Sequence, residues 1–381
     1  MTRTLVLGAG FGGLAVATGL RQSLPEEHEI VLVDERESFA MGLRKLWDIV
    51  GIGTIAEGSR SRESLNERGI RFVQEEIVAI DPARRSAVIG GESMDGDHLV
   101  VALGARSRPD LVQGLESHGH NAWDIDGVPR LREAFDSLDR GRIVIAIAGA
   151  PYRCPPAPYE LTMLLDDVLR ERGIRNRIEL EVSTLAPMLM PNAGLAGSQL
   201  IADLLDAKEI GHSVGRGVER IEAGRVIYAD AELEFDLLIG IPPDRAPGVV
   251  TESGLTGEGE WVEVDRGTLA TKHEGVFAIG DINQIKLANG LPMPMAGSFA
   301  ELQGERVAGA IAAEILGTDP PAPFDGRGAC FLEVGTAQAA MVEGEFFAEP
   351  EPQVQITEPT TTHAAEKRSF ESERLARWFG A

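Results

Sequence analysis

Near its start the chain carries the run Thr4-Leu5-Val6-Leu7-Gly8-Ala9-Gly10-Phe11-Gly12-Gly13, in which a short apolar segment leads into a turn of the pattern G-x-G-x-x-G. In such a turn Gly8 permits a tight change of direction, and Gly10 lets the backbone approach a pyrophosphate. Gly12 belongs to the same turn, and Gly13 lets the following helix pack closely on the strand. We expect this helix to run to about Ser23, with the positive end of its dipole directed at phosphate groups.

The next predicted strand, residues 30–33, ends in two acids, Asp34 and Glu35. We expect Asp34 to accept hydrogen bonds from the hydroxyls of an adenosine ribose, with Glu35 as the second choice. A lone G-x-G-x-x-G is a weak signal, but a preceding strand, a following helix and an acid after the next strand make it specific. The pattern predicts a dinucleotide site without distinguishing FAD from NAD.

Strand and helix patterns alternate along most of the chain, which indicates a doubly wound α/β fold. A second unit is expected as a strand at 142–147, a helix at 158–172 and a strand at 178–182. A strand within 276–281 ends in Gly-Asp, and a helix is expected over 298–316.

Two later segments favour FAD. The run Leu99-Val100-Val101-Ala102-Leu103-Gly104-Ala105 resembles the strand-to-glycine crossover of flavoproteins with two dinucleotide domains, which implies that Ala102 and Gly104 lie at the cofactor. Residues 268–281 resemble the late flavin motif of the same proteins, in which an aspartate, here Asp281 after Gly280, holds a ribityl hydroxyl of FAD. The alternative for Asp281 is an ordinary acidic helix cap.

We therefore predict an α/β protein with two Rossmann-like dinucleotide-binding domains, the FAD domain being discontinuous, and a small C-terminal region. The predicted boundaries are 1–107 and 235–321 for the FAD domain, 108–234 for the second domain, and 322–381 for the C-terminal region.

The C-terminal region combines a proline-rich stretch with a short helix. Residues 348–365 contain three prolines among Glu and Thr, and we expect a linker or an exposed loop. Residues 366–379 predict an amphipathic helix whose apolar side chains are Phe370, Leu375, Trp378 and Phe379. This helix is either a peripheral membrane anchor or a cap on the protein's own core or on a dimer interface.

Composition excludes several classes of protein. The chain has 381 residues and a formal net charge of −24, so nucleic acid is not an expected partner and an anionic membrane surface is disfavoured. Two cysteines are too few for a secreted disulfide scaffold. No signal peptide is recognised, and no apolar run approaches the roughly 18 residues that span a bilayer. We expect a cytoplasmic protein, or one attached peripherally to the cytoplasmic side of a membrane.

The second strand–turn–helix unit lacks the glycine pattern of the first. After the strand, residues 148–160 read Ala-Gly-Ala-Pro-Tyr-Arg-Cys-Pro-Pro-Ala-Pro-Tyr-Glu. The four prolines have no backbone N–H group, and a phosphate cradle is built from such donors. We expect the second domain to keep its fold and to have lost nicotinamide binding.

The segment Arg153–Glu160 closely resembles the R-C-P-P-x-P-Y-E segment of flavocytochrome c sulfide dehydrogenase flavoproteins and the active-cysteine segment of sulfide:quinone oxidoreductases. The resemblance covers about residues 1–340. It includes Pro242–Pro247, Trp261–Asp265 and Gly328–Glu333.

This resemblance implies a reaction in which hydrosulfide attacks a disulfide or polysulfide bridge between two cysteines near the flavin. One cysteine becomes a persulfide, and the other leaves as a thiolate and delivers two electrons. Cys154 and Cys330 match these cysteines, and the residue that carries the persulfide stays open. Cys154 lies beside Arg153 and before a helix N-terminus, which favours a thiolate. Glu160 matches a candidate proton carrier, the alternative being an ordinary first-turn glutamate.

Two departures qualify the resemblance. The stretch 39–44 lacks the cysteine through which flavocytochrome-type subunits hold FAD, so we expect FAD to be bound non-covalently. Met295 stands where relatives usually carry a lysine, although the helix after Gly297 would still direct its positive end at the flavin.

We expect sulfide or polysulfide as substrate and a quinone as electron acceptor, with oligomerisation as one means of strengthening a weak membrane contact. The alternatives are a c-type cytochrome as acceptor and a non-catalytic flavoprotein that acts as a redox sensor or assembly partner. A type II NADH dehydrogenase is disfavoured by the prolines of the second turn.

Overall fold

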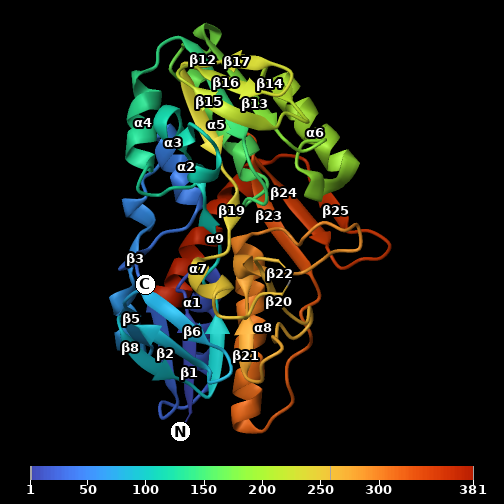
Figure 1. The fold of residues 1–381 in the computed structure, drawn as a ribbon. Coiled ribbons are helices and arrows are strands. Elements are labelled where there is room, and N and C mark those ends of the chain that lie inside the picture. Colours follow the sequence, from blue (N-terminus) through green and yellow to red (C-terminus); the bar gives the residue numbers. More distant parts are fainter. Residues whose placement is uncertain (1, 258, 381) are drawn as a thin grey trace.

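The computed structural model describes residues 2–257 and 259–380. Its first domain is built on a parallel five-stranded sheet in the order β21-β9-β1-β2-β5 (Figure 1). The strands are buried on both faces, as parallel sheets covered by helices require, and Leu5, Val6 and Leu7 have no exposed surface. The bounds are β1 Arg3–Leu7, β2 Glu29–Asp34, β5 Arg71–Gln74, β9 His98–Val101 and β21 Val276–Ala278, with helices α1 Phe11–Ser23 and α8 Gly297–Leu316.

The second domain repeats this plan with the sheet order β11-β18-β12-β13-β14. Its bounds are β11 His120–Asn121, β12 Gly141–Ile147, β13 Ile178–Thr184, β14 Gly211–Ser213 and β18 Leu237–Ile241, with helices α4 Val128–Ser137, α5 Ala157–Glu171 and α6 Gly194–Ala207. The predicted boundary at residue 235 is wrong, because β18 pairs with β12 over residues 237–241. The chain returns to the first domain only after Ile241.

Smaller elements decorate and connect the two domains. Besides the C-terminal sheet, two three-stranded antiparallel sheets and three two-stranded ladders occur in the described residues. Their strands are β6 Ile77–Asp81, β7 Ser86–Ile89 and β8 Glu92–Asp95; β15 Val218–Glu222, β16 Arg225–Tyr228 and β17 Glu232–Glu234; β3 Ser38–Phe39 with β4 Arg60–Ser61; β10 Arg106–Ser107 with β19 Asp244–Arg245; and β20 Val262–Glu263 with β22 Asn283–Gln284. Short helices are α2 Leu43–Val50, α3 Leu115–His118 and α7 Gly248–Thr251. The β10–β19 ladder joins the two crossings between the domains.

The C-terminal region contains an antiparallel sheet of β23 (Arg327–Glu333), β24 (Ala339–Glu345) and β25 (Gln353–Ile356), followed by α9 (Thr361–Phe379). The prediction of a linker or loop over 348–365 is therefore wrong in two places. Val354 and Ile356 alternate with glutamines and pair as an edge strand, and Thr360 caps α9 by accepting a hydrogen bond from the His363 backbone. The three prolines of this stretch, Pro350, Pro352 and Pro359, lie outside the strand, before and after it.

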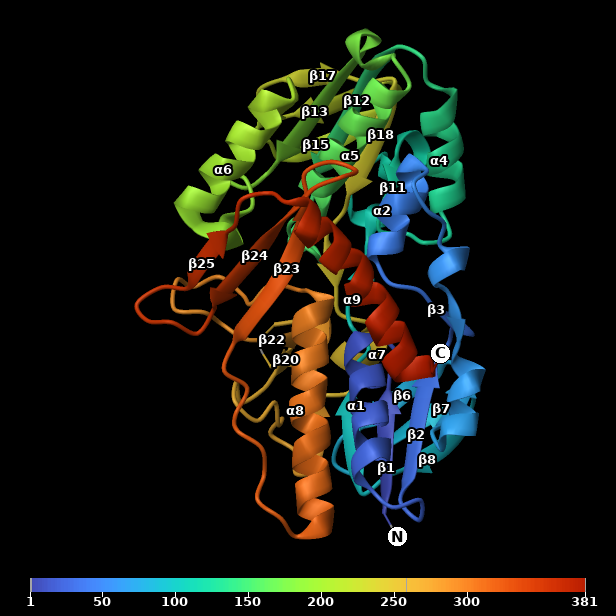
Figure 2. The same ribbon diagram turned by 180° about the vertical axis from the view of Figure 1, so that it is seen from behind.

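Helix α9 runs from this sheet down onto the first domain (Figure 2). Leu375, Trp378 and Phe379 are buried, and the Trp378 ring lies edge-on to Phe11 and Phe39 with ring centroids 5.3 and 5.6 Å away. Its apolar face therefore completes the protein's own core, and the interpretation of α9 as a membrane anchor is wrong. Within the described residues, no helix is long and apolar enough to cross a bilayer.

We expect Trp378→Ala to lower the free energy of unfolding by about 3–5 kcal/mol, because it empties a buried aromatic site. Chemical denaturation measures this change. Glu373→Ala, an exposed position on the same helix, serves as the control and should change stability by less than about 0.5 kcal/mol. Equal stability of the two variants would contradict the placement of α9 in the core.

Candidate active site

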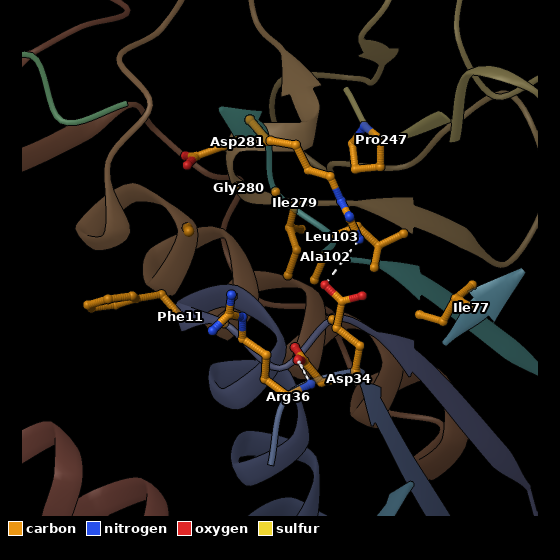
Figure 3. Close-up of a pocket in the computed structure, with 18 of the residues that line it drawn as sticks. Phe11, Asp34, Arg36, Ile77, Ala102, Leu103, Pro247, Ile279, Gly280 and Asp281 are labelled. Atoms are coloured by element: carbon orange, nitrogen blue, oxygen red, sulfur yellow. Dashed lines mark hydrogen bonds and ion pairs between the residues drawn. The ribbon is translucent and has the colours of Figure 1, made fainter. Parts of the chain in front are cut away.

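A cavity of about 360 Å³ opens beside the turn between β1 and α1 (Figure 3). Ten of the predicted cofactor residues line it: Gly8, Gly10, Gly12, Asp34, Glu35, Ala102, Gly104, Gly280, Asp281 and Gly297. Gly13 is predicted as well but lies behind the turn, where a Cβ would approach the Gly8 carbonyl oxygen to 1.8 Å. The structure thus brings together segments from both parts of the discontinuous domain.

The glycine turn has the backbone geometry that a phosphate cradle needs. Gly8 has φ +100°, and a Cβ there would lie 2.3 Å from the carbonyl oxygen of Ala102, so only glycine fits. Gly10 is different, because no atom lies within 4 Å of the position its Cβ would take. The backbone at the start of α1 is therefore open to a ligand in the cavity, where its free N–H groups and the helix dipole favour an anion.

The two acids at the end of β2 hold the turn as well as line the cavity. The Asp34 carboxylate accepts hydrogen bonds from the backbone N–H groups of Ala9 at 2.8 Å and Arg36 at 2.9 Å. Glu35 is paired with Arg106 at 3.2 Å. Because each carboxylate oxygen can accept more than one hydrogen bond, Asp34 retains acceptor capacity for a ligand hydroxyl.

Four arginines at the cavity were not predicted from the sequence: Arg36, Arg62, Arg106 and Arg153. They are scattered along the chain, and only Arg153 lies in a motif, where it was assigned to Cys154 and not to the cofactor cavity. Arg62 is buried and donates to the carbonyl oxygens of Ala9 and Ser38. Its bond to Ala9 holds the glycine turn against the segment that follows β2. Carboxylates line the cavity as well, and the four guanidinium groups among them are donors of the kind that binds a pyrophosphate.

Asp281 lies across the cavity from Asp34 and Arg36 (Figure 3). Burial raises the pKa of Asp281 to about 6, and the nearby Arg153 opposes the shift. A carboxylate held in a partly desolvated wall without a direct ion pair is well placed to accept a hydrogen bond from a ligand hydroxyl.

The corresponding turn of the second domain is closed. A Cβ at Gly149 would lie 2.2 Å from the Cδ atom of Pro243, so the backbone at this position packs against that proline ring. The prolines at 151, 155, 156 and 158 follow. These four residues have no N–H group to offer a phosphate.

The two cysteines, far apart in the sequence, meet at the start of α8. The backbone N–H of Cys154 donates to the carbonyl oxygen of Met295 at 2.7 Å. The Cys330 Sγ lies 3.5 Å from the Oγ atom of Ser298 in the first turn of α8. Both cysteines are half-buried free thiols. Gly297, between these two contact points, lines the cofactor cavity.

The expectation that Cys154 is a ready thiolate is wrong for this geometry. Burial raises the pKa of Cys154, and the negative charges of Glu160 and Cys330 add to the shift. Burial likewise raises the pKa of Cys330. The Arg153 guanidinium does not offset these shifts in the pKa of Cys154, because it is paired with the Asp244 carboxylate at 2.8 Å.

Glu160 belongs to a buried charge cluster rather than to an exposed helix turn. Its Oε1 atom accepts hydrogen bonds from the Lys367 Nζ at 2.5 Å and from the Glu333 backbone N–H at 2.7 Å. Lys367 also donates to Glu333 at 2.8 Å, and the Trp47 indole donates to the same carboxylate at 3.0 Å. Burial raises the pKa of Glu160, while Lys367 opposes the rise. Burial alone would lower the pKa of Lys367, but Glu160 and Glu333 hold it above its ordinary value.

Sequence reasoning also missed Lys367 and Lys45. Lys367 lies in the segment predicted as an amphipathic helix, where only the apolar side chains were assigned a role. Lys45 lies in α2, and its Nζ donates to the Trp123 carbonyl oxygen at 3.0 Å. Burial lowers the pKa of Lys45 to about 7, and the nearby Arg153 adds to the shift. The sequence around each lysine carries no motif that would reveal its burial.

Comparison with known proteins gives the family. The family model described as pyridine nucleotide-disulphide oxidoreductase matches residues 2–301, most of the chain. The chain belongs to the pyridine nucleotide-disulphide oxidoreductase family. The two Rossmann-like domains and the discontinuous cofactor domain are the architecture expected of this family.

Relatives within this family support the resemblance seen in the sequence. A sulfide-quinone reductase of Aquifex aeolicus is 28% identical over 341 residues, covering 82% of this chain and 75% of the relative. A demethylphylloquinone reductase of Synechocystis is 31% identical over 337 residues, covering 83% of this chain and 80% of the relative. The crystal structure of the Aquifex aeolicus sulfide:quinone oxidoreductase superposes with a TM-score of 0.90 at 23% identity, covering 100% of this chain and 92% of that chain.

The cavity fits the flavin that this family uses. The open backbone at Gly10 and the arginines suit a pyrophosphate, and Asp34 and Asp281 lie on opposite sides of the cavity of about 360 Å³ (Figure 3). A flavin held by these residues would supply the capacity to accept and return electron pairs.

We expect Asp281→Asn to weaken flavin binding by roughly 10–100-fold, the effect of losing a charged hydrogen-bond acceptor. The same change should stabilise the apoprotein at pH 8. The raised pKa of Asp281 means that stability falls as pH rises from about 4 through 6, by at most about 3 kcal/mol.

Titration of apoprotein with FAD and thermal unfolding at pH 5 and pH 8 measure the two effects. At pH 5 the variant should be more stable than the wild-type apoprotein by about half of the difference at pH 8, because Asp281 ionises near pH 4 in the unfolded chain and near pH 6 in the folded protein. Unchanged affinity for FAD in the variant would remove Asp281 from the cofactor site.

Proposed function

We propose that this protein is an FAD-dependent oxidoreductase that oxidises sulfide to sulfur or polysulfide through Cys154 and Cys330 and passes the electrons to a quinone. The observation that carries the proposal is the meeting of the chain's two cysteines at the N-terminal end of α8, where that helix also lines the cofactor cavity. Relatives named as sulfide:quinone oxidoreductases, in Aquifex aeolicus and Dictyostelium discoideum, support this assignment.

The proposed reaction starts from the oxidised enzyme, in which the two thiols have lost two protons and passed two electrons through a bound flavin to the acceptor, and are joined by a disulfide. Hydrosulfide attacks this disulfide. One S–S bond forms and one breaks, so one cysteine becomes a persulfide and the other leaves as a thiolate. The persulfide and the thiolate then join with the added sulfur between them, which releases two electrons and one proton. The electrons pass to the flavin and from it to the acceptor.

The geometry favours Cys330 as the cysteine that receives the added sulfur. Cys330 lines a second, apolar cavity of about 20 Å³, together with Pro155, Met190 and Phe299. A cavity of this size holds about one water-sized molecule. We propose that sulfide reaches the thiol pair through this cavity.

The cluster of Glu160, Glu333 and Lys367 is the proposed proton acceptor. Two carboxylates share one ammonium group, so full ionisation leaves one negative charge without a direct partner. Because burial raises the pKa of Glu160, this carboxylate takes up the proton most readily. We therefore propose Glu160 as the proton carrier. Its negative charge raises the pKa of both Cys154 and Cys330, as expected of a carboxylate that lies near both thiols.

A c-type cytochrome is the second candidate acceptor. The net charge of −24 favours it, because a basic protein would be attracted to this surface. A quinone is the first choice, and its lipid solubility requires that the enzyme reach a bilayer surface. We therefore propose peripheral contact with the cytoplasmic side of a membrane, with homo-oligomerisation strengthening that contact.

We expect Cys154→Ser and Cys330→Ser each to abolish sulfide-dependent quinone reduction while the flavin stays bound. The residues act as one unit, so the double variant should be no less active than either single variant. Steady-state turnover with a soluble quinone measures this, and dithionite reduction of the flavin confirms an intact cofactor. A single variant with near wild-type turnover would contradict the cysteine mechanism and would favour a non-catalytic role.

We further expect FAD to be bound non-covalently, because residues 39–44 contain no cysteine and the two cysteines present serve the thiol site. Acid precipitation of the purified protein should leave the yellow colour in the supernatant. Colour that stays with the pellet would overturn this expectation.

A further inference from the structure

The loop that carries Cys154 is held by backbone contacts from three separate elements. The Arg153 N–H donates to the Asp244 carboxylate at 2.8 Å, and the Arg153 carbonyl oxygen accepts from the Trp123 indole at 3.0 Å. The next N–H group, that of Cys154, donates to the Met295 carbonyl oxygen at 2.7 Å. Three consecutive backbone polar groups are thus fixed by Trp123 of the second domain, by Asp244 of the β10–β19 ladder and by the approach to α8.

Cys154 itself needs such support. Its φ is +57°, in the left-handed region that residues other than glycine rarely adopt. A conformation of this kind costs of order 1–3 kcal/mol and persists only where the surroundings over-determine it. The three contacts around Arg153 and Cys154 supply that constraint.

Asp244 makes the strongest of these contacts. Its side chain has no exposed surface, and its second carboxylate oxygen accepts from the Arg153 guanidinium at 2.8 Å. Its own backbone N–H donates to the Pro151 carbonyl oxygen at 2.7 Å, so Asp244 holds the loop at both Pro151 and Arg153. Arg153 also lines the cofactor cavity, so its side chain connects the buried Asp244 carboxylate to the cofactor site.

We propose that Asp244 is a positioning residue for Cys154: through Arg153 it keeps the cysteine in its left-handed conformation beside the start of α8. Asp244 touches neither thiol, and its part in the chemistry is to fix geometry. The inference rests on the proposed function in so far as Cys154 is taken to be redox-active, but the geometric claim can be tested without the reaction.

The test uses Asp244→Asn, which keeps an oxygen for the Arg153 N–H and removes the charge that holds the guanidinium. Arg153→Lys is the companion variant, because an ammonium keeps the charge but cannot make the forked contact. Asp166→Asn is the matched control. Asp166 is equally buried and paired with Arg170 and Arg175, but it lies toward the other end of α5 from the cysteine loop.

Two measurements are made on each folded variant. The first is the rate constant for anaerobic reduction of the flavin by sulfide, which should fall by roughly 10–100-fold in Asp244→Asn, as expected for a small misplacement of a reacting group. The second is the rate at which iodoacetamide alkylates Cys154 in a Cys330→Ser background, followed by mass spectrometry without flavin. We expect it to rise several-fold, because the loop opens more often.

Arg153→Lys should show intermediate effects, and Asp166→Asn should match the wild-type protein in both measurements. Asp244→Asn that behaves as Asp166→Asn would overturn the proposal. If Asp244→Asn does not fold, Arg153→Lys decides by the same comparison. Sulfide reduction that survives Cys154→Ser would defeat the proposed function instead, and the alkylation rates would still decide whether Asp244 positions the loop.

Discussion

Helix α8 packs against α1 at a separation that only glycine allows: a Cβ at Gly304 would lie 2.6 Å from the carbonyl oxygen of Gly12. This contact brings the N-terminal ends of both helices to the same cavity. It also sets the position of residues 295–298, which hold Cys154 through a backbone carbonyl and meet Cys330 through Ser298. The cofactor cavity and the thiol pair thus depend on one helix–helix approach. A side chain at Gly304 would move both together.

Charge inside this acidic protein is arranged in pairs that tie the C-terminal region to the site. Helix α9 contributes Lys367 to the carboxylate cluster and Glu371 to Arg44, which donates to it at 2.7 Å. Removing one partner of a buried pair leaves an uncompensated charge and typically costs 3–5 kcal/mol. The C-terminal helix is therefore part of the active-site scaffold, and the conformational freedom of the thiol site is limited by it.

The local parts of the fold could be predicted from the sequence because their determinants are local. The apolar runs gave the central strands, the glycine pattern gave the first turn, and the prolines after Gly149 indicated the lost second cradle. The features that escaped prediction depend on tertiary contacts. The shift of the Cys154 pKa needs the burial and the approach of Glu160, neither of which is visible in the segment Arg153–Glu160.

The wrong predictions for the C-terminal region, a membrane anchor and a loop, also concern features that depend on tertiary contacts. The apolar residues of α9 would suit a membrane surface as well as a core, and only the position of Phe11 and Phe39 decides between them. Lys367 has an acid four residues further on, Glu371, but this acid pairs with Arg44, and the partners of Lys367 come from α5 and β23. Strand β25 likewise forms by pairing with β24. In the sequence, Val354 and Ile356 are too few to indicate a strand among prolines that are typical of a loop.

We propose that electrons enter this protein from sulfide through the thiol pair and not from a nicotinamide through the second domain. The most direct measurement is an anaerobic titration of the purified, flavin-loaded protein, followed in the flavin absorbance, with sulfide in one cell and NADH in another. We expect sulfide to bleach the flavin with a two-electron stoichiometry, while NADH leaves it oxidised because the prolines at 151, 155, 156 and 158 lack the N–H donors of a phosphate cradle. Rapid bleaching by NADH with no response to sulfide would contradict this proposal.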